Sequence, residues 1–379
     1  MQYLDYDRNK IKWNGKSPVN KTFLIAPMAP DSALMIFNAS GDLLVKKETD
    51  GYPAYFVQLD DLSGYIYSAG KTRVNDQMPQ GSGFCANGNY TIGKLYITDN
   101  NLETKKVVDY IPTEMTKNAL GIHMHGSYVL GENHYLLQII SMADVVINDK
   151  PSYVVNCIIQ EQLNGEVIWE WQTIDDPKLF EASFECNTFF DKAVQEKKYA
   201  SDYAHMNSVI KTSDGKYMYI SLKHIGIVKL DYETKKVVWI AGTNKKTSLK
   251  FPDKILPFAH QHDLHLIDDN TIYFWDNKHF CYTEMGVVDN KIVHYKTLKY
   301  PTRCNLAVMG NVIRVNENIM DVCYGLRMPP LPHIYMQPII AEFDLTTGKK
   351  LMDLTIRDYS DQLVNAVYQV NRGVNIYEN

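Results

Sequence analysis

The sequence has no long apolar run and no cluster of basic residues. No stretch reaches the roughly 18 apolar residues of a membrane helix, and the N-terminal segment lacks the apolar core of a secretory signal. We therefore expect a soluble chain without a membrane partner; a mature exported chain would look the same, so the compartment stays open. The formal net charge of -5 argues against a nucleic-acid partner, because proteins that bind nucleic acid carry a basic face.

Cysteine is also sparse. The six cysteines include no CxxC pair and no Cys/His zinc spacing. Several have apolar or aromatic neighbours, as in the segments NCII and HFCY, which favours free thiols in or near the core. A long-range disulfide stays open at this point. Neither the cysteines nor any other motif indicates a cofactor.

Long amphipathic helical patterns are almost absent, and a strand-turn-strand unit recurs instead. Its six turns lie near Gly41, Thr104, Gly165, Thr234, Asn290 and Gly348. Turn residues between β-branched and aromatic runs are typical of hairpins, and successive turns are roughly 56 to 69 residues apart. This period fits four strands per repeat. The sequence predicts an all-β fold, a six-bladed β-propeller with mostly four-stranded antiparallel blades.

No linker or shift in composition divides the chain, so we expect a single propeller domain over residues 1–379. The first residues are expected to supply the strand that closes the ring. The segment LFEASFECNTFFDKAVQEKK predicts a helical insertion at about residues 179–200. It is read either as a lid over one face or as a long loop between blades.

Three histidines open similar hairpin patterns. His125 begins HGSYVLGENHYLL, His205 begins HMNSVIKTSDGKYMYIS, and His262 begins HDLHLIDDNTIYFW. A residue type kept at one place in a repeat occupies an equivalent place in each structural repeat. We therefore expect the three imidazoles to converge where the innermost strands meet.

Polar neighbours accompany these histidines. Asn207 lies two residues after His205 and shares its face of the strand. Lys223 ends the following strand, in SLKH, and is a cation that can reach the same axis.

The segments DYAHMNSVIKTSDGKYMYISLKHIGIVKLD, KKVVWIAG and FAHQHDLHLIDDNTIYFWDN together resemble the core of the bacterial arylsulfate sulfotransferase family. The resemblance is specific from Gly121 to Asn277 and rests on the blade pattern elsewhere. Its strongest element is the order of His, His-x-Asn, a basic residue with His, and Gln-His.

The resemblance implies an enzyme that needs no cofactor and no nucleotide sulfate donor. It implies transfer of a sulfuryl group from an aryl sulfate to a phenol by a ping-pong mechanism. His262 matches the family nucleophile, which becomes a sulfohistidine, and His125 matches the first channel histidine. His205 and Asn207 match the pair that binds the sulfuryl oxygens and exchanges protons with the phenolic oxygen.

Two further expectations concern the substrate. Aromatic residues at the channel mouth, among them Tyr203, Tyr324 and Trp275, suit an aromatic ring. Lys223 stands where the family carries arginine. Lysine keeps the positive charge but lacks the planar guanidinium that can bind two oxygens at once. We expect either weaker orientation of the sulfuryl group or altered specificity.

Two alternatives belong to other classes. Three imidazoles with an open position also suit a divalent metal, so His125, His205 and His262 are compatible with a metal-dependent hydrolase. A non-catalytic propeller that binds a carbohydrate or a protein is the other alternative, since a fold alone does not define an activity. The natural donor and acceptor and the oligomeric state stay open.

Overall fold

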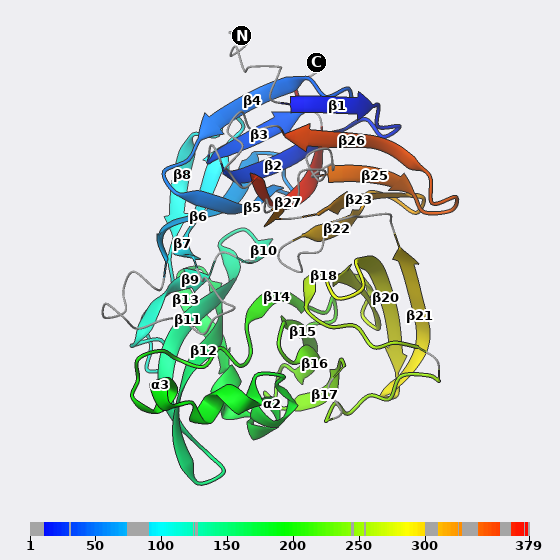
Figure 1. The fold of residues 1–379 in the computed structure, drawn as a ribbon. Helices are drawn as coiled ribbons and strands as arrows, with labels where there is room; N and C mark the ends of the chain where they lie inside the picture. The colour runs from blue at the N-terminus through cyan, green and yellow to red at the C-terminus, as the bar shows by residue number, and fades with distance from the viewer. Residues whose placement is uncertain are drawn as a thin grey trace. The chain divides into compact units, whose positions relative to one another are not determined.

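The computed structural model describes residues 11–29, 32–73, 91–123, 125, 128–243, 246–253, 255–299, 310–324, 326–327, 340–356, 365–374 and 376–377. They form an all-β fold with a short helical insertion (Figure 1). The chain divides into two compact units. The first comprises Met1–Ala69, Leu95–Val108 and Leu298–Asn379, and the second comprises Gly70–Lys94 and Asp109–Thr297. No helix in these ranges is long and apolar enough to span a membrane.

The second unit contains two four-stranded antiparallel sheets, each built in sequence order. One consists of β14 (Met206–Lys211), β15 (Tyr217–Leu222), β16 (Gly226–Asp231) and β17 (Val237–Ala241). The other consists of β18 (Gln261–Asp268), β19 (Thr271–Asp276), β20 (Cys281–Val288) and β21 (Lys291–Lys299). A four-stranded meander is the blade topology of β-propellers.

Local sequence explains the first of these meanders. Between β14 and β15, Gly215 adopts a φ of 72°, which a side chain would disfavour. On β15, Ile220 packs in the cluster that includes Val155 of a neighbouring sheet, while Tyr219 packs on the opposite side with Phe274 of β19. Because β15 is covered on both faces, its sequence YMYISL reads as a nearly continuous apolar run.

A nine-stranded sheet runs in the order β13-β12-β11-β9-β7-β6-β5, with β10 paired to β11 and β8 paired to β7. Its strands are β5 (Tyr52–Gln58), β6 (Gly64–Arg73), β7 (Thr91–Asp99), β8 (Thr104–Val108), β9 (Ala119–His123), β10 (Tyr128–Gly131), β11 (His134–Ile147), β12 (Lys150–Leu163) and β13 (Glu166–Gln172). Pairing of β7 with β9 joins its two halves.

The first unit holds two five-stranded sheets. One runs β1 (Ile11–Gly15), β26 (Lys350–Ile356), β25 (Ile340–Asp344), β23 (Ile319–Cys323) and β22 (Asn311–Arg314). The other runs β24 (Leu326–Arg327), β27 (Asn365–Val374), β2 (Lys21–Ala29), β3 (Ala33–Phe37) and β4 (Leu43–Glu48). The pairing of β1 with β26 confirms that the first residues complete a sheet built from the end of the chain.

The predicted all-β class, antiparallel blades and propeller-type arrangement of sheets are confirmed. Six separate blades are not: the described strands form four blade-like sheets of four or five strands, and the remaining sheet has nine. The difference arises because β7 hydrogen-bonds to β9, which merges two sets of strands. A single domain over residues 1–379 stays a prediction.

The segment expected to be helical follows β13. It contains η1 (Thr173–Asp175), α2 (Pro177–Ala182), η2 (Cys186–Phe190) and α3 (Lys192–Gln195). Asp176 caps α2 by accepting a hydrogen bond from the backbone N–H of Lys178, and Pro177 occupies the first turn. A cavity of about 630 Å³ lies between this insertion and the end of β11.

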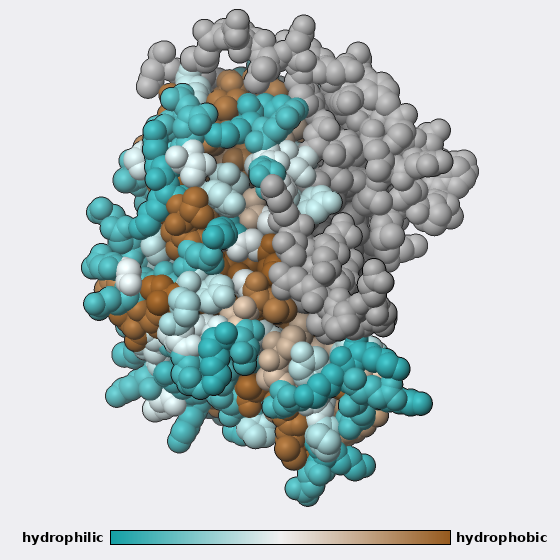
Figure 2. All heavy atoms as spheres, turned by 90° about the vertical axis from the view of Figure 1, so that its left-hand side faces the viewer, coloured by the Kyte–Doolittle hydropathy of each residue, from teal (hydrophilic) through white to brown (hydrophobic). Residues whose placement is uncertain are grey.

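The four described cysteines form no disulfide with one another. Cys157, Cys281 and Cys323 are buried, and Cys186 is exposed. Cys85 and Cys304 lie outside the described residues. On the face of the molecule drawn in Figure 2, polar side chains cover much of the coloured surface, and apolar residues form small patches between them.

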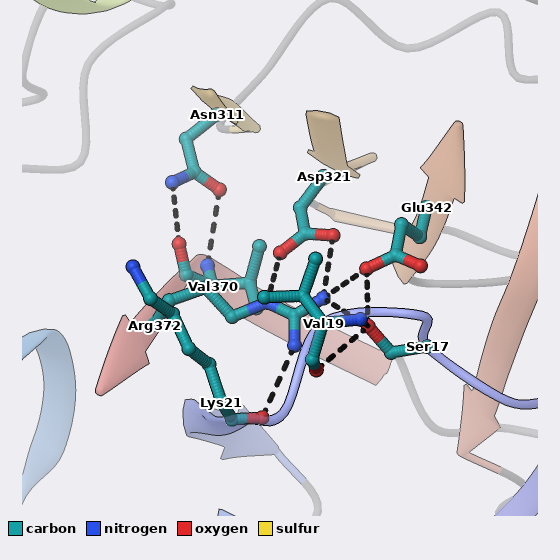
Figure 3. A network of polar contacts seen from close by, with 8 residues as sticks. All are labelled: Ser17, Val19, Lys21, Asn311, Asp321, Glu342, Val370 and Arg372. Atoms are coloured by element: carbon teal, nitrogen blue, oxygen red, sulfur yellow. Dashed lines mark hydrogen bonds and ion pairs between the residues drawn. The ribbon is translucent and has the colours of Figure 1, made fainter. Parts of the chain in front are cut away.

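A buried ion network links the two sheets of the first unit (Figure 3). The guanidinium of Arg372 on β27 donates to both carboxylate oxygens of Asp321, at 2.5 and 3.0 Å, and also donates to Glu342. Its Cζ lies 3.2 Å from the ring centroid of Phe23. Burial raises the pKa of Glu342, and the charge of Asp321 adds to that effect. One cation therefore holds two buried carboxylates.

Replacing Arg372 by methionine tests this network. Arg372→Met leaves Asp321 and Glu342 buried without their cation, so we expect a loss of about 3–5 kcal/mol in the free energy of unfolding. Urea unfolding followed by tryptophan fluorescence measures the loss. The control is Lys349→Met, which removes a cation from an exposed position. A change in Arg372→Met no larger than in the control would contradict the assignment.

Candidate active site

The three predicted histidines come together within the second unit. The ring centroids of His125 and His205 are 5.5 Å apart, and those of His125 and His262 are 5.3 Å apart. His205 and His262 are 5% and 4% exposed. The expected convergence of the three imidazoles is therefore observed, with His205 and His262 buried and His125 partly exposed.

The first strands of two neighbouring sheets position two of these histidines. His205 directly precedes β14, and His262 is the second residue of β18; β14 and β18 contact each other (Figure 1). His205, His260 and Asp263 adopt positive φ values of 51°, 53° and 55°. Non-glycine residues rarely adopt this conformation, and such strained positions cluster at functional sites.

Strand β18 is fastened to the preceding sheet immediately beside His262. Asn207 Nδ2 donates to the backbone oxygen of Gln261 at 2.7 Å, and Gln261 Nε2 donates to the backbone oxygen of Leu222 at 2.9 Å. All three side chains are buried. Asn207, predicted to bind sulfuryl oxygens, thus has a structural bond that fixes the backbone next to His262.

A histidine pair orients His125. His123 is fully buried, and its Nε2 lies 2.6 Å from Nδ1 of His125, with the two rings stacked at 4.1 Å. One of these nitrogens donates and the other accepts, so the pair couples the tautomer of His125 to that of His123.

A carboxylate orients His205. Asp202 is fully buried, and its Oδ2 lies 2.6 Å from Nδ1 of His205. The same oxygen lies 3.9 Å from Nε2 of His224, which is 1% exposed. Nδ1–H of His205 donates to the carboxylate, which leaves Nε2 on the opposite edge of the ring.

Burial keeps most of these imidazoles neutral. Desolvation lowers the pKa of His123 and His125 well below the usual value, and neighbouring imidazoles lower it further. Desolvation also lowers the pKa of His205 despite the opposing effect of Asp202, and it lowers the pKa of His224 to about 3. Neutral imidazole is the form that can act as a nucleophile or a base near pH 7.

Lys223 supplies a cation to the cluster. Its backbone N–H donates to the carbonyl oxygen of His205 at 2.9 Å. Its positive charge contributes to the lowered pKa of His125, His205 and His224. The site therefore combines neutral nitrogens and the carboxylate of Asp202 with the positive charge of Lys223, which can attract an anionic substrate.

The predicted aromatic residues have separate surroundings. The Tyr203 ring is fully buried and lies 4.6 Å from the ring of Phe180 and 5.7 Å from that of Phe189, in the insertion. This core packing accounts for its burial without a substrate. Tyr324 follows β23 in the first unit. Contact of either residue with a substrate stays a prediction.

A group of residues with the spacing of metal ligands occurs, but it differs from the predicted set of His125, His205 and His262. In the part of the chain that the structure describes, side chains of Asp202, His205 and His224 offer ligand atoms within 4.8 Å of one another. However, Asp202 Oδ2 and His205 Nδ1 are only 2.6 Å apart. Ligands about 2.1 Å from one tetrahedral ion are separated by about 3.4 Å. The observed distance is that of a hydrogen bond, so these residues do not fit a metal as arranged.

Sequence reasoning missed Asp202, which lies in DYAHMNSV three residues before His205. The signal was a carboxylate close in sequence to a histidine that starts a strand. A second Asp-x-x-His pair, Asp276 and His279, makes the same 2.6 Å bond elsewhere in the unit. The spacing alone therefore does not distinguish a functional pair from a structural one.

Comparison with protein families places the chain in a class that these features fit. A family model for arylsulfotransferases (ASST) matches residues 44–300, well over half of the chain and all of the histidine cluster. The chain belongs to the arylsulfotransferase family. No curated protein matches it.

Solved structures support the fold alone. A Bacteroides caccae protein of unknown function matches with a TM-score of 0.54 and 10% identity, over 93% of this chain and 99% of that one. AztD from Citrobacter koseri matches with a TM-score of 0.40 and 10% identity, over 94% and 99%. The WD40 β-propeller domain of Doa1 matches with a TM-score of 0.42 and 7% identity, over 93% and 88%. The latter two scores are too low to carry an argument.

The buried neutral imidazoles predict a pH-dependent stability. An unfolded histidine binds a proton below its pKa of about 6.5, whereas folded His224 resists protonation until about pH 3. Stability is thus fully present above pH 6.5 and falls as the pH decreases through this window. At about pH 5, His224 alone accounts for a loss of about 2 kcal/mol.

Denaturant unfolding at about pH 7.5 and about pH 5 measures this effect. His224→Leu should lose less stability on acidification than the wild type does, by about 2 kcal/mol. His294→Leu, which changes a half-exposed histidine, serves as the control. Equal pH dependence in His224→Leu and the wild type would show that His224 is protonated in the folded protein.

Proposed function

We propose that this arylsulfotransferase moves a sulfuryl group from an aryl sulfate to a phenol through a sulfohistidine at His262. The observation that carries the proposal is the meeting of His125, His205 and His262 in a buried cluster beside the charge of Lys223. Family membership supports aryl sulfate and phenol as the substrate classes.

The transfer divides into two displacements. First, His205 takes a proton from solvent, a ring nitrogen of His262 attacks sulfur, the bond from sulfur to the phenolic oxygen breaks, and the leaving oxygen takes the proton from His205. In the second step the acceptor phenol gives its proton to His205, its oxygen bonds to sulfur, and the nitrogen–sulfur bond of His262 breaks. No net proton is gained or lost over both steps.

The groups around the cluster stabilise the negative charge of the transition state. In the transition state, the sulfuryl group that is being transferred carries negative charge on its oxygens. A cation fixed in a water-poor site stabilises this charge strongly. Lys223 takes the role of the family arginine, with His125 and the amide of Asn207 as further donors. Asn207 already donates one N–H to Gln261, so its second N–H serves the substrate.

We also propose that the sheets represent six blades. Among the described residues, the β7–β9 junction contains two residue pairs, Ile92 with His123 and Gly93 with Ile122. If the nine-stranded sheet is divided at this junction, β5 to β8 form one set of strands and β9 to β13 form another. Together with the four other sheets, these make six sets of strands. In this arrangement β9, β14 and β18 are equivalent innermost strands, and each carries or adjoins a histidine of the cluster.

Substitution of His262 tests the proposal. With p-nitrophenyl sulfate as donor, the wild type should release p-nitrophenol in a manner dependent on a phenol acceptor, and donor alone should add one sulfuryl group to the protein mass. His262→Ala should lose both, with activity reduced by at least about 10³-fold. His294→Ala, at a half-exposed histidine, should retain both. Absence of release and adduct in the wild type across a panel of aryl sulfates would favour a non-catalytic binding propeller.

Charge at position 223 gives a second test. Lys223→Met removes the cation and should lower kcat/KM for aryl sulfates by about 10²-fold to 10³-fold. Lys223→Arg keeps the charge and should stay within about tenfold of the wild type. Lys216→Met, in an exposed turn, is the control. Equal kcat/KM in Lys223→Met and the wild type would remove Lys223 from the site.

A further inference from the structure

We propose that Asp202 is a positioning residue that makes His205 the general acid and base of the sulfuryl transfer. This inference rests on the proposed function and adds a residue to it. Asp202 acts through His205 and does not touch the substrate, so it governs only the protonation and orientation of that imidazole.

The geometry of the pair is the first support. Asp202 is 0% exposed, and its Oδ2 lies 2.6 Å from His205 Nδ1. A buried carboxylate at this distance fixes the tautomer with hydrogen on Nδ1. Nε2 is then the nitrogen that exchanges a proton, and it lies on the ring edge away from Asp202.

The backbone holds the pair in place. His205 has a φ of 51°, in the left-handed region. Its carbonyl oxygen accepts from the backbone N–H of Lys223 at 2.9 Å, and that of Ala204 accepts from His224 at 3.3 Å. The turn between Asp202 and β14 is therefore tied to the end of β15, which limits rotation of the imidazole away from the cluster.

The surroundings of the ring indicate where Nε2 acts. His205 lies edge-on to His125 at 5.5 Å and edge-on to His123 at 6.3 Å between ring centroids. His125 in turn lies 5.3 Å from His262. His205 thus stands between a buried carboxylate and the cluster that contains the nucleophile.

The electrostatic balance explains why the carboxylate is needed. Desolvation and the charge of Lys223 both disfavour the protonated form of His205, whereas the charge of Asp202 favours it. Without Asp202, His205 would rarely hold the proton that a leaving phenolate requires. With Asp202, the imidazolium formed at Nε2 is stabilised for the moment of transfer.

Each half-reaction balances with Asp202 ionised throughout. Before the first displacement, neutral His205 takes a proton from solvent at Nε2. When the sulfur–oxygen bond of the donor breaks and the bond from sulfur to His262 nitrogen forms, the phenolate oxygen takes that proton from His205 Nε2. When the acceptor oxygen bonds to sulfur and the bond to His262 breaks, the acceptor proton returns to Nε2. The Nδ1–H bond to Asp202 stays intact in both steps.

The test compares Asp202→Asn with the wild type on aryl sulfates whose leaving phenols differ in acidity. A weakly acidic phenol needs protonation as it leaves, whereas p-nitrophenol leaves readily as an anion. Asp202→Asn should lower kcat/KM for phenyl sulfate by about 10²-fold to 10⁴-fold and for p-nitrophenyl sulfate by less than about tenfold. Rate should therefore depend more steeply on leaving-group pKa in the variant.

The matched control is Asp276→Asn, which alters the Asp276–His279 pair of the same spacing and the same 2.6 Å bond. Any loss there should be equal for all donors. A loss in Asp202→Asn that is likewise equal for all donors would make Asp202 structural and overturn the inference, with the proposed function intact. A wild type inactive on every donor would instead overturn the proposed function and this inference with it.

If Asp202→Asn fails to fold, a second measurement on the wild type still tests the inference. The ¹⁵N shifts of His205 in the wild type report its tautomer directly. A proton on Nδ1 with Nε2 unprotonated supports the assignment. A neutral ring with its proton on Nε2 overturns it, because Asp202 would then not hold Nδ1–H.

Discussion

The burial of several imidazoles in one cluster is the constraint on which the site depends. A buried imidazolium is costly, so burial lowers the pKa of His123, His125, His205 and His224 and favours their neutral form near pH 7. The same burial would strand each polar atom without a partner if the rings were not paired. The contacts of His123 with His125 and of Asp202 with His205, each at 2.6 Å, meet this need for one nitrogen of each of these rings.

The strands supply these pairs because β14 and β18 begin, and β9 ends, where the cluster lies. His205 precedes β14, His262 lies in β18, and Asn207 bonds the two strands together beside His262. Lys223 enters from the turn after β15, with its backbone bonded to His205. Side chains from separate repeats thus meet without any long loop to carry them.

Much of this arrangement followed from periodicity, and some did not. Hairpin turns and apolar alternation predicted the antiparallel sheets, and three histidines at one place in the repeat predicted their convergence. The merging of two strand sets through β7 and β9 was not predictable, because it depends on backbone hydrogen bonds that leave no sequence pattern. Asp202 was missed since an identical Asp-x-x-His spacing at Asp276 is equally compatible with a structural role.

The central claim is that His262 carries the sulfuryl group between donor and acceptor. Its most direct test is to incubate the protein with an aryl sulfate and no acceptor, then locate the added group by peptide mass mapping. The account predicts a sulfuryl group on the peptide that contains His262, which a phenol removes. An adduct on another residue, or acceptor-dependent transfer without any adduct, would contradict it.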